Sequence, residues 1–316
     1  MLVILALVLL STGASTMIYE VVLIREFTVI LGSSFYSSAI VLSSVMLGLS
    51  MGAYIFGKYS ERCNPIKVLF LLEISIATIS IFVVPLGRLV DYFDWDLAVF
   101  FSFLIPLIPA TLMGGEIPIA IKIASNRMGV GESSGICYSL DTLGGIAGSL
   151  MAGFLLIPWL GSLKTVLVAG TLNLIGALSV LTLNRFEFSL KIPKRFVMAS
   201  ILTLAVIGFA YLISDAIDFS TQAEIYEGFH ILNLTHTRYQ TIVIAYHPIL
   251  GRCLFLDGSL QISDVGNASY SESIVLPALI TLLSHKKPID VLIIGGGDLG
   301  VAEVLTRFPK RYIRSI

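Results

Sequence analysis

Charged residues are scarce in this sequence. Asp, Glu, Lys and Arg make up 13% of the 316 residues, whereas a soluble globular chain carries about 25%. Hydrophobic residues make up 56%, and the mean hydropathy is +0.92. The shortage of charge excludes an ordinary soluble domain and predicts an integral membrane protein.

An excess of positive charge and a set of metal-binding residues are also missing. The net charge is −1, so no basic face is available for a phosphate backbone, and nucleic acid is not an expected partner. Cys63, Cys137 and Cys253 are odd in number and form no CxxC pair. They predict neither a disulfide framework nor a zinc site, the four histidines lack ligand spacing, and no metal is expected.

Long apolar runs fill the first two thirds of the chain. Each is long enough to cross a bilayer as a helix, which takes about 17 to 25 residues. The expected spans are 2–18, 36–57, 67–87, 97–121, 136–159, 163–183 and 196–213. The first could be read as a signal peptide, but it has no positive leading region and the chain soon returns to the membrane, so a span is preferred.

The loop cations are distributed unevenly between the two ends of these seven spans. One side carries nine: Lys58, Arg62, Lys67, Lys122, Arg127, Arg185, Lys191, Lys194 and Arg195. The other side carries Arg25, Arg88 and Lys164. Because positive loops favour the cytoplasm, this bias places the polar region that follows the last span on the opposite side.

Charges at membrane depth mark either function or helix packing. Glu116 lies among prolines and glycines that should break its helix, as in transporter sites, although structural kinking alone is the preferred explanation. Glu20, Arg25 and Glu26 are expected to pair with one another on an interfacial helix. Glu73 is expected near a helix end, and Asp141 near a helix start.

Two spans contain small residues spaced four apart. Gly48 and Gly52 form one such pair, and Gly144 and Gly148 form the other. This spacing lets helix backbones approach closely without any ligand.

From Thr221 the pattern changes to short alternating runs, AEIYEGFHILNLTHT, YQTIVIAYH and RCLFLDGSLQIS. His247-Pro248 and Asp257-Gly258 punctuate them, which indicates strands and hairpins. A helix is expected over about 268–285, then a buried strand over 291–294, a glycine-rich turn and a helix from about Val301.

The glycine-rich turn has the spacing G-x-G-x-x-G in Gly295, Gly297 and Gly300, between the expected strand and helix. Glycines let a ligand approach the backbone, and the helix start offers free N–H donors. Asp298 inside the turn would repel a pyrophosphate. The turn therefore favours a nucleoside with a cationic amine or sulfonium over NAD.

These residues resemble the spermidine synthase (polyamine aminopropyltransferase) family. The matching segments are RYQTIVI, LFLDGSLQ, YSES and VLIIGGGDLGVAEVL, in the family's order over about 224–308. YEVVLIREF, MLGLSMGAY and YSLDTLGGIAGSL resemble the multi-pass domain that some members carry in front. The resemblance implies transfer of an aminopropyl group from decarboxylated S-adenosylmethionine, as a co-substrate and not a tightly bound cofactor, to putrescine or a related amine.

The resemblance also implies roles for single residues. Gln240 contacts the nucleoside, Tyr270 and the neighbouring Ser271 line the amine site, and Asp298 holds the cationic amine. The nucleoside loop consists of Gly295, Gly296, Gly297 and Gly300. Three features depart from the family's pattern: Ser271 replaces a histidine, Leu299 a glycine, and Gly266 and Asn267 an acidic pair.

The acid that grips the ribose and the D-x-x-D segment with the proton acceptor are expected beyond Ile316. Truncation of a longer protein is the first explanation, and a degenerate non-catalytic relative is the second. An incomplete chain of this kind is expected to be inactive.

The expected fold is a multi-pass α-helical membrane domain (1–213), a small β-hairpin domain (221–264) and the start of a Rossmann-like, methyltransferase-type α/β domain (265–316). The alternative function is a transporter or sensor with a regulatory nucleotide-binding appendage. Expected partners are a small-molecule amine, the lipid bilayer and further copies in a homo-oligomer.

The expected location is the cell membrane, with the polar region in the cytoplasm, where the family's donor is made. This requires one span to be interfacial or re-entrant, with 2–18 and 196–213 as candidates. The cytoplasmic location agrees with the loop charges only if 196–213, or another expected span after Lys67, does not cross the membrane.

Overall fold

The chain folds into two compact units in a computed structural model that describes residues 2–187, 194–226, 228–237, 239–283, 288–309 and 312–315. The first unit contains Met1–Ile225 together with His236–Gln240, and the second contains Tyr226–Thr235 and Thr241–Ile316. Each unit is described by itself.

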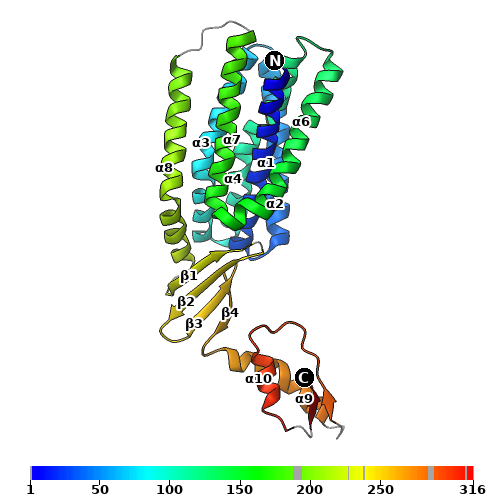
Figure 1. Ribbon diagram of the computed structural model, residues 1–316, viewed down its shortest axis with the longest axis vertical. Coiled ribbons are helices and arrows are strands. Elements are labelled where there is room, and N and C mark those ends of the chain that lie inside the picture. The colour runs from blue at the N-terminus through cyan, green and yellow to red at the C-terminus, as the bar shows by residue number, and fades with distance from the viewer. Residues whose placement is uncertain are drawn as a thin grey trace. The chain divides into compact units, whose positions relative to one another are not determined.

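The first unit consists of long apolar helices (Figure 1). They are α1 (Leu2–Leu31), α2 (Ser34–Ser60), α3 (Pro65–Arg88), α4 (Trp95–Gly114), α5 (Glu116–Ala124), α6 (Val130–Met151), α7 (Ile157–Glu187) and α8 (Lys194–Ile225). Short turns η1 (Leu89–Tyr92) and η2 (Ala152–Leu156) follow α3 and α6. Within the described residues, six helical segments are long and apolar enough to cross a membrane.

One of these segments, Val130–Leu183, is 54 residues long. As a single helix it would extend about 80 Å, more than twice the bilayer core. Gly161 interrupts it with φ 74° and ψ 176°, a backbone conformation that glycine adopts without steric cost. The expected spans 136–159 and 163–183 lie on either side of this break.

Helix α1 differs from its expected form. It is continuous over 30 residues, so the segment after residue 18 is not a separate interfacial helix. Glu26 does not depend on its own helix for a partner, because it forms an ion pair with Arg88 of α3. The sequence could not indicate this contact, since the two residues are 62 positions apart.

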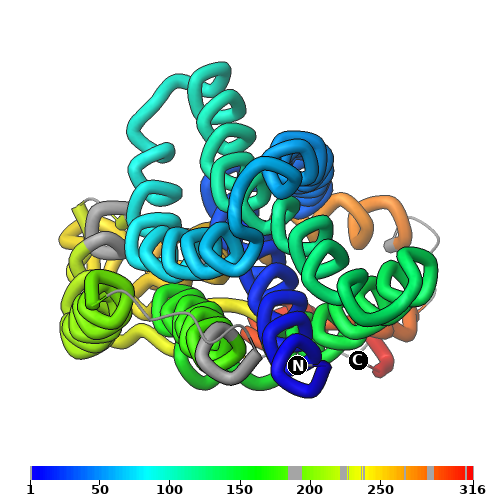
Figure 2. The backbone as a smooth tube through the Cα atoms, turned by 90° about the horizontal axis from the view of Figure 1, so that it is seen from above, coloured from blue at the N-terminus to red at the C-terminus, as the bar shows by residue number. Residues whose placement is uncertain are grey.

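Both expected glycine pairs lie at close helix contacts, as predicted. A Cβ atom on Gly52 of α2 would lie 2.0 Å from the Thr111 carbonyl oxygen of α4, and one on Gly148 of α6 would lie 2.2 Å from the Ala14 oxygen of α1. Figure 2, which looks down the helices, shows α1 in dark blue between α6 and α7. Only glycine permits these backbone approaches.

The helix break near Glu116 is also confirmed. Helix α4 ends at Gly114, Gly115 is the cap, and α5 begins at Glu116. Pro106 and Pro109 lie inside α4 and do not end it.

Helices α1 and α8, the two candidates for a re-entrant element, are continuous over 30 and 32 residues. Both contain an apolar stretch long enough to cross a membrane. Within the described residues neither candidate is shortened, and the loop charges still oppose the expected cytoplasmic location.

The second unit begins with a four-stranded sheet in the order β1 (His230–His236), β2 (Thr241–His247), β3 (Gly251–Leu256), β4 (Ser259–Ser263). Strands β2, β3 and β4 pair antiparallel. Asp257 and Gly258 connect β3 to β4 with φ angles of 46° and 83°, as a two-residue hairpin turn of type I′ requires. The hairpins are confirmed, but the strand expected from Thr221 is wrong up to Ile225, where α8 ends.

One face of this sheet carries the local core. Val243, Ala245, Cys253 and Phe255 are buried. Phe229 packs edge-on against Phe255, with 5.0 Å between the ring centroids.

The rest of the second unit contains α9 (Asn267–Leu283), β5 (Ile289–Asp290), α10 (Gly300–Thr306) and β6 (Ile313–Ser315). Strands β5 and β6 are parallel, with α10 between them along the chain. Val275 and Leu279 of α9 pack with Val304 and Leu305 of α10 in a common core. A strand, a helix and a parallel strand form the repeating unit of an α/β sheet.

Candidate functional site

The glycine-rich turn lies between β5 and α10. Gly295 and Gly296 have φ angles of 90° and 64°, which side chains with a Cβ rarely adopt. The Leu299 N–H donates to the Gly296 carbonyl at 2.9 Å, and buried Gly300 begins α10. The turn expected from the glycine spacing is therefore present.

The strand before this turn differs from its expected form. The hydrogen-bonded strand is Ile289–Asp290, and 291–294 follow it outside the described ladder, apart from one bond from the Val291 N–H to Ser315. Val291 and Ile293 face the core with α9 and α10, but Leu292 and Ile294 are 83% and 90% exposed. Alternate residues of an extended segment point to opposite sides. The described elements cover only the side of Val291 and Ile293, so the expected fully buried strand is wrong.

Leu299 has a φ of 60°, in the left-handed region. This conformation costs a residue with a Cβ about 1 kcal/mol. Leu299 is thus a strained residue beside Asp298.

We expect Leu299→Gly to raise the stability of the second unit by about 0.5 to 1 kcal/mol, because glycine removes this strain. Thermal unfolding of the two variants Leu299→Gly and Leu299→Ala would check it. The alanine variant removes the same exposed apolar side chain but retains the Cβ. Equal melting temperatures for the two variants would contradict the explanation.

Asp298 and Tyr270 line the same cavity, of about 520 Å³. Gly296 of the turn and Asp290 at the end of β5 also line it, and apolar residues of α9, of α10 and of 289–294 form the rest of the lining. A cavity of this size can hold a small molecule. Residues from the YSES and GGGDLG segments thus line one cavity, although Tyr270 and Asp298 are 28 positions apart in the sequence.

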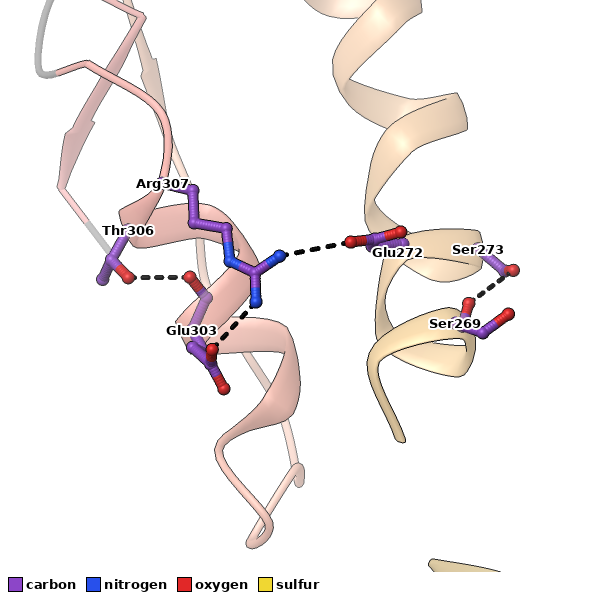
Figure 3. A network of polar contacts seen from close by, with 6 residues as sticks. All are labelled: Ser269, Glu272, Ser273, Glu303, Thr306 and Arg307. Carbon is purple, nitrogen blue, oxygen red and sulfur yellow. Dashed lines mark hydrogen bonds and ion pairs between the residues drawn. The ribbon is translucent and has the colours of Figure 1, made fainter. Parts of the chain in front are cut away.

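Helix α9, which carries Tyr270, is linked to α10 by an ion-pair network. Arg307 donates to Glu272 of α9 at 3.2 Å and to Glu303 of α10 at 2.9 Å (Figure 3). In the same view, Ser273 donates to the Ser269 carbonyl inside α9. Exposed pairs of this kind add little stability.

Ser271 does not point into the cavity beside its neighbour. Tyr270 is 64% exposed, whereas Ser271 is 1% exposed and its hydroxyl has no hydrogen-bond partner within the described residues. Consecutive helix residues point about 100° apart, so an amine that contacts Tyr270 would not reach Ser271 from the same direction. The role of Ser271 in substrate binding stays a prediction.

Asp290 was not selected from the sequence. Arg314 of β6 donates to its carboxylate at 2.9 Å, and Ser315 donates to the same oxygen. These hydrogen bonds, that of Arg314 above all, lower the pKa of Asp290 below its usual range. Asp290 is thus an ionised carboxylate at the cavity rim. Its place at the carboxyl end of a parallel strand, where α/β ligands bind, could have indicated it.

Gln240 directly precedes β2. Its N–H donates to the Thr237 hydroxyl at 3.0 Å, and its carbonyl accepts from the same hydroxyl at 2.7 Å. Gln240 is not among the residues that line the cavity with Asp298. Its shared site with Asp298 stays a prediction.

Of the carboxylates Glu73, Asp141 and Glu116 in the first unit, Glu73 and Glu116 are buried, and Glu73 and Asp141 lie elsewhere than expected. Glu73 is the ninth residue of α3 and 0% exposed, not near a helix end. Asp141 lies in the middle of α6, not near its start. Both predictions assumed shorter helices. Glu116 is 2% exposed.

Within the described residues, no group of three or more His, Cys, Asp or Glu is arranged to hold a metal ion.

The chain is similar over most of its length to proteins named polyamine aminopropyltransferase. One from Leptospira interrogans is 29% identical over 295 residues, 92% of this chain and 56% of the relative. One from Oceanobacillus iheyensis is 30% identical over 91% of this chain and 55% of the relative. Polyamine aminopropyltransferase 1 from Streptomyces coelicolor is 27% identical over 95% and 56%.

The similarity includes the helical unit as well as the polar one, and the resemblance seen in the motifs is confirmed. The chain spans a little over half the length of these relatives. No family model matches the chain, and no solved structure matches it.

Proposed function

We propose that the protein is a membrane-bound polyamine aminopropyltransferase that uses decarboxylated S-adenosylmethionine and putrescine or a related amine. The observation that carries the proposal is that Asp298 and Tyr270, from two motifs of that family, line one cavity. Relatives with this name, matched over more than nine tenths of the chain, support it.

The proposed reaction needs positioning and proton transfer. The amine nitrogen attacks the methylene carbon bonded to the sulfonium, and the new C–N bond forms as the C–S bond breaks. The electron pair of that bond stays on sulfur, which becomes a neutral thioether. A carboxylate takes the proton that the nitrogen loses.

The charges around the cavity suit such substrates. Asp298 and Asp290 are carboxylates, and the turn between them offers no cation for a pyrophosphate. In the proposal Asp298 holds the cationic amine, Tyr270 lines the path of the acceptor, and Gln240 binds the nucleoside through its side-chain amide. Gly266 and Asn267, which stand where the resemblance places two acids, leave fewer carboxylates for a second ammonium group of the acceptor.

The six long apolar segments support a multi-pass location in the cell membrane. In this proposal the polar region faces the cytoplasm, because the donor is made there, although the loop cations favour the other side.

We expect Asp298→Asn in the full-length protein to lower kcat/KM for aminopropyl transfer about 100-fold, because an amide cannot balance the amine's charge. The measurement is release of methylthioadenosine from decarboxylated S-adenosylmethionine and putrescine. Glu303→Gln is the matched control: it removes an exposed carboxylate from the same unit outside the cavity, and we expect a change of less than about threefold.

Two outcomes would contradict the proposal. Full activity of Asp298→Asn would refute the site. No turnover by the unmodified full-length protein with any amine tested would refute the function.

A further inference from the structure

The helical unit contains a cavity of its own, of about 630 Å³. Residues of α1, α2, the α4–α5 break and α6 line it. Gly13, which closely approaches α6, and Gly114, which closely approaches α2, are both part of its wall. The cavity therefore lies next to these two helix contacts. Short side chains that bring each pair of helices together thus leave space between the pairs.

A single carboxylate, that of Asp141, lines this cavity. Asp141 makes no ion pair within the described part of the chain, whereas Glu26, Asp215 and Asp218 of the same unit all do. A charge midway along an apolar helix is costly unless a counter-charge or water compensates it. The cavity beside Asp141 is where such a counter-charge can lie.

A second carboxylate, that of Glu116, follows the wall residue Gly114 by two positions and is 2% exposed. Within the described residues, one of its oxygens has no hydrogen-bond partner. Burial of an acceptor without a donor is costly, so the protein next to this cavity is short of hydrogen-bond donors.

The wall decides which cation fits. Met17, Met46 and Met113 present flexible apolar surface, and a cavity of this volume matches an organic ligand. A bare Na⁺ or Ca²⁺ instead needs a tight cage of several oxygens. The Thr16 and Thr142 hydroxyls donate to carbonyls of their own helices at 2.9 and 2.8 Å, so their oxygens remain available as acceptors for an ammonium.

We propose that this cavity is a binding site for an aliphatic amine in its ammonium form, with the charge held by Asp141 and the methylene chain against the methionines. The site shares no residue with the one proposed for aminopropyl transfer and does not depend on it. It assigns a ligand to the helical unit, which would otherwise act only as an anchor.

The test is calorimetric titration of the full-length protein in phosphatidylcholine nanodiscs with 1-aminobutane, corrected with empty nanodiscs. The neutral 1-butanol is the matched probe. We expect the amine to bind and the alcohol to bind at least about tenfold more weakly, since it lacks the charge-assisted contact. We expect Asp141→Asn to weaken amine binding about 10-fold to 100-fold.

Ala53→Leu is the second variant, because it fills the cavity from α2 and keeps the carboxylate; it should weaken binding as well. Asp96→Asn, which removes an exposed carboxylate at the start of α4 outside the cavity, should leave binding unchanged. Asp298→Asn should also leave it unchanged, which separates this proposal from the enzymatic one. Equal affinity for 1-butanol, or undiminished binding by Asp141→Asn, would overturn the proposal.

Discussion

Replacement of Arg88 by methionine is expected to destabilise the helical unit by about 3 to 5 kcal/mol, the range measured when one partner of a buried ion pair is removed. Arg88 lies at the end of α3 and forms ion pairs with Glu26 of α1 at 2.8 Å and with Asp218 of α8 at 2.6 Å. All three side chains are largely buried. Without Arg88, two buried carboxylates lose the cation that balances them both.

Lys164→Met is the control that separates the effect of burial from the effect of losing an ion pair. Lys164 of α7 also pairs with a carboxylate of α8, that of Asp215, at 2.6 Å, but the Asp215 side chain is 80% exposed. This variant should cost at most about 1 kcal/mol. Both are measured by unfolding of the purified protein in SDS titrations. Neutralising all three residues, as Glu26→Gln, Arg88→Met and Asp218→Asn together, should recover much of the loss. Equal losses for Arg88→Met and Lys164→Met would show that the buried triad is not the cause.

The features that the sequence predicted correctly depend on local rules. Apolar runs predicted the long helices because each must span the bilayer on its own. Asp257-Gly258 predicted a hairpin because both positions require positive φ angles. The four-residue spacing of glycines predicted close helix contacts because it places both glycines on one face of the helix, where a neighbouring backbone can approach.

The features that it missed depend on residues far apart in the chain. The partners of Arg88 come from two other helices, and sequence spacing cannot indicate which helices are neighbours in the fold. The exposure of Leu292 and Ile294 depends on what covers the second side of a strand, which the strand's own residues do not determine. For the candidate site, the structure places Asp298 and Tyr270 of two quoted motifs at one cavity, but the places of Asp290 and of the cavity at Asp141 are visible only in the folded chain.

Replacement by alanine is expected to change the stability of the helical unit in opposite directions at two glycines of α6. Gly148→Ala is expected to destabilise the helical unit by about 1 to 3 kcal/mol, since its Cβ would lie 2.2 Å from the Ala14 carbonyl oxygen and α1 must move away. Gly135→Ala, on the same helix, meets nothing within 4 Å and should stabilise it by about 0.5 to 1 kcal/mol through helix propensity. SDS unfolding of both variants measures the difference. If both substitutions stabilise the protein, α1 and α6 do not pack through this glycine; if both destabilise it, the loss at Gly148 cannot be assigned to the contact with α1.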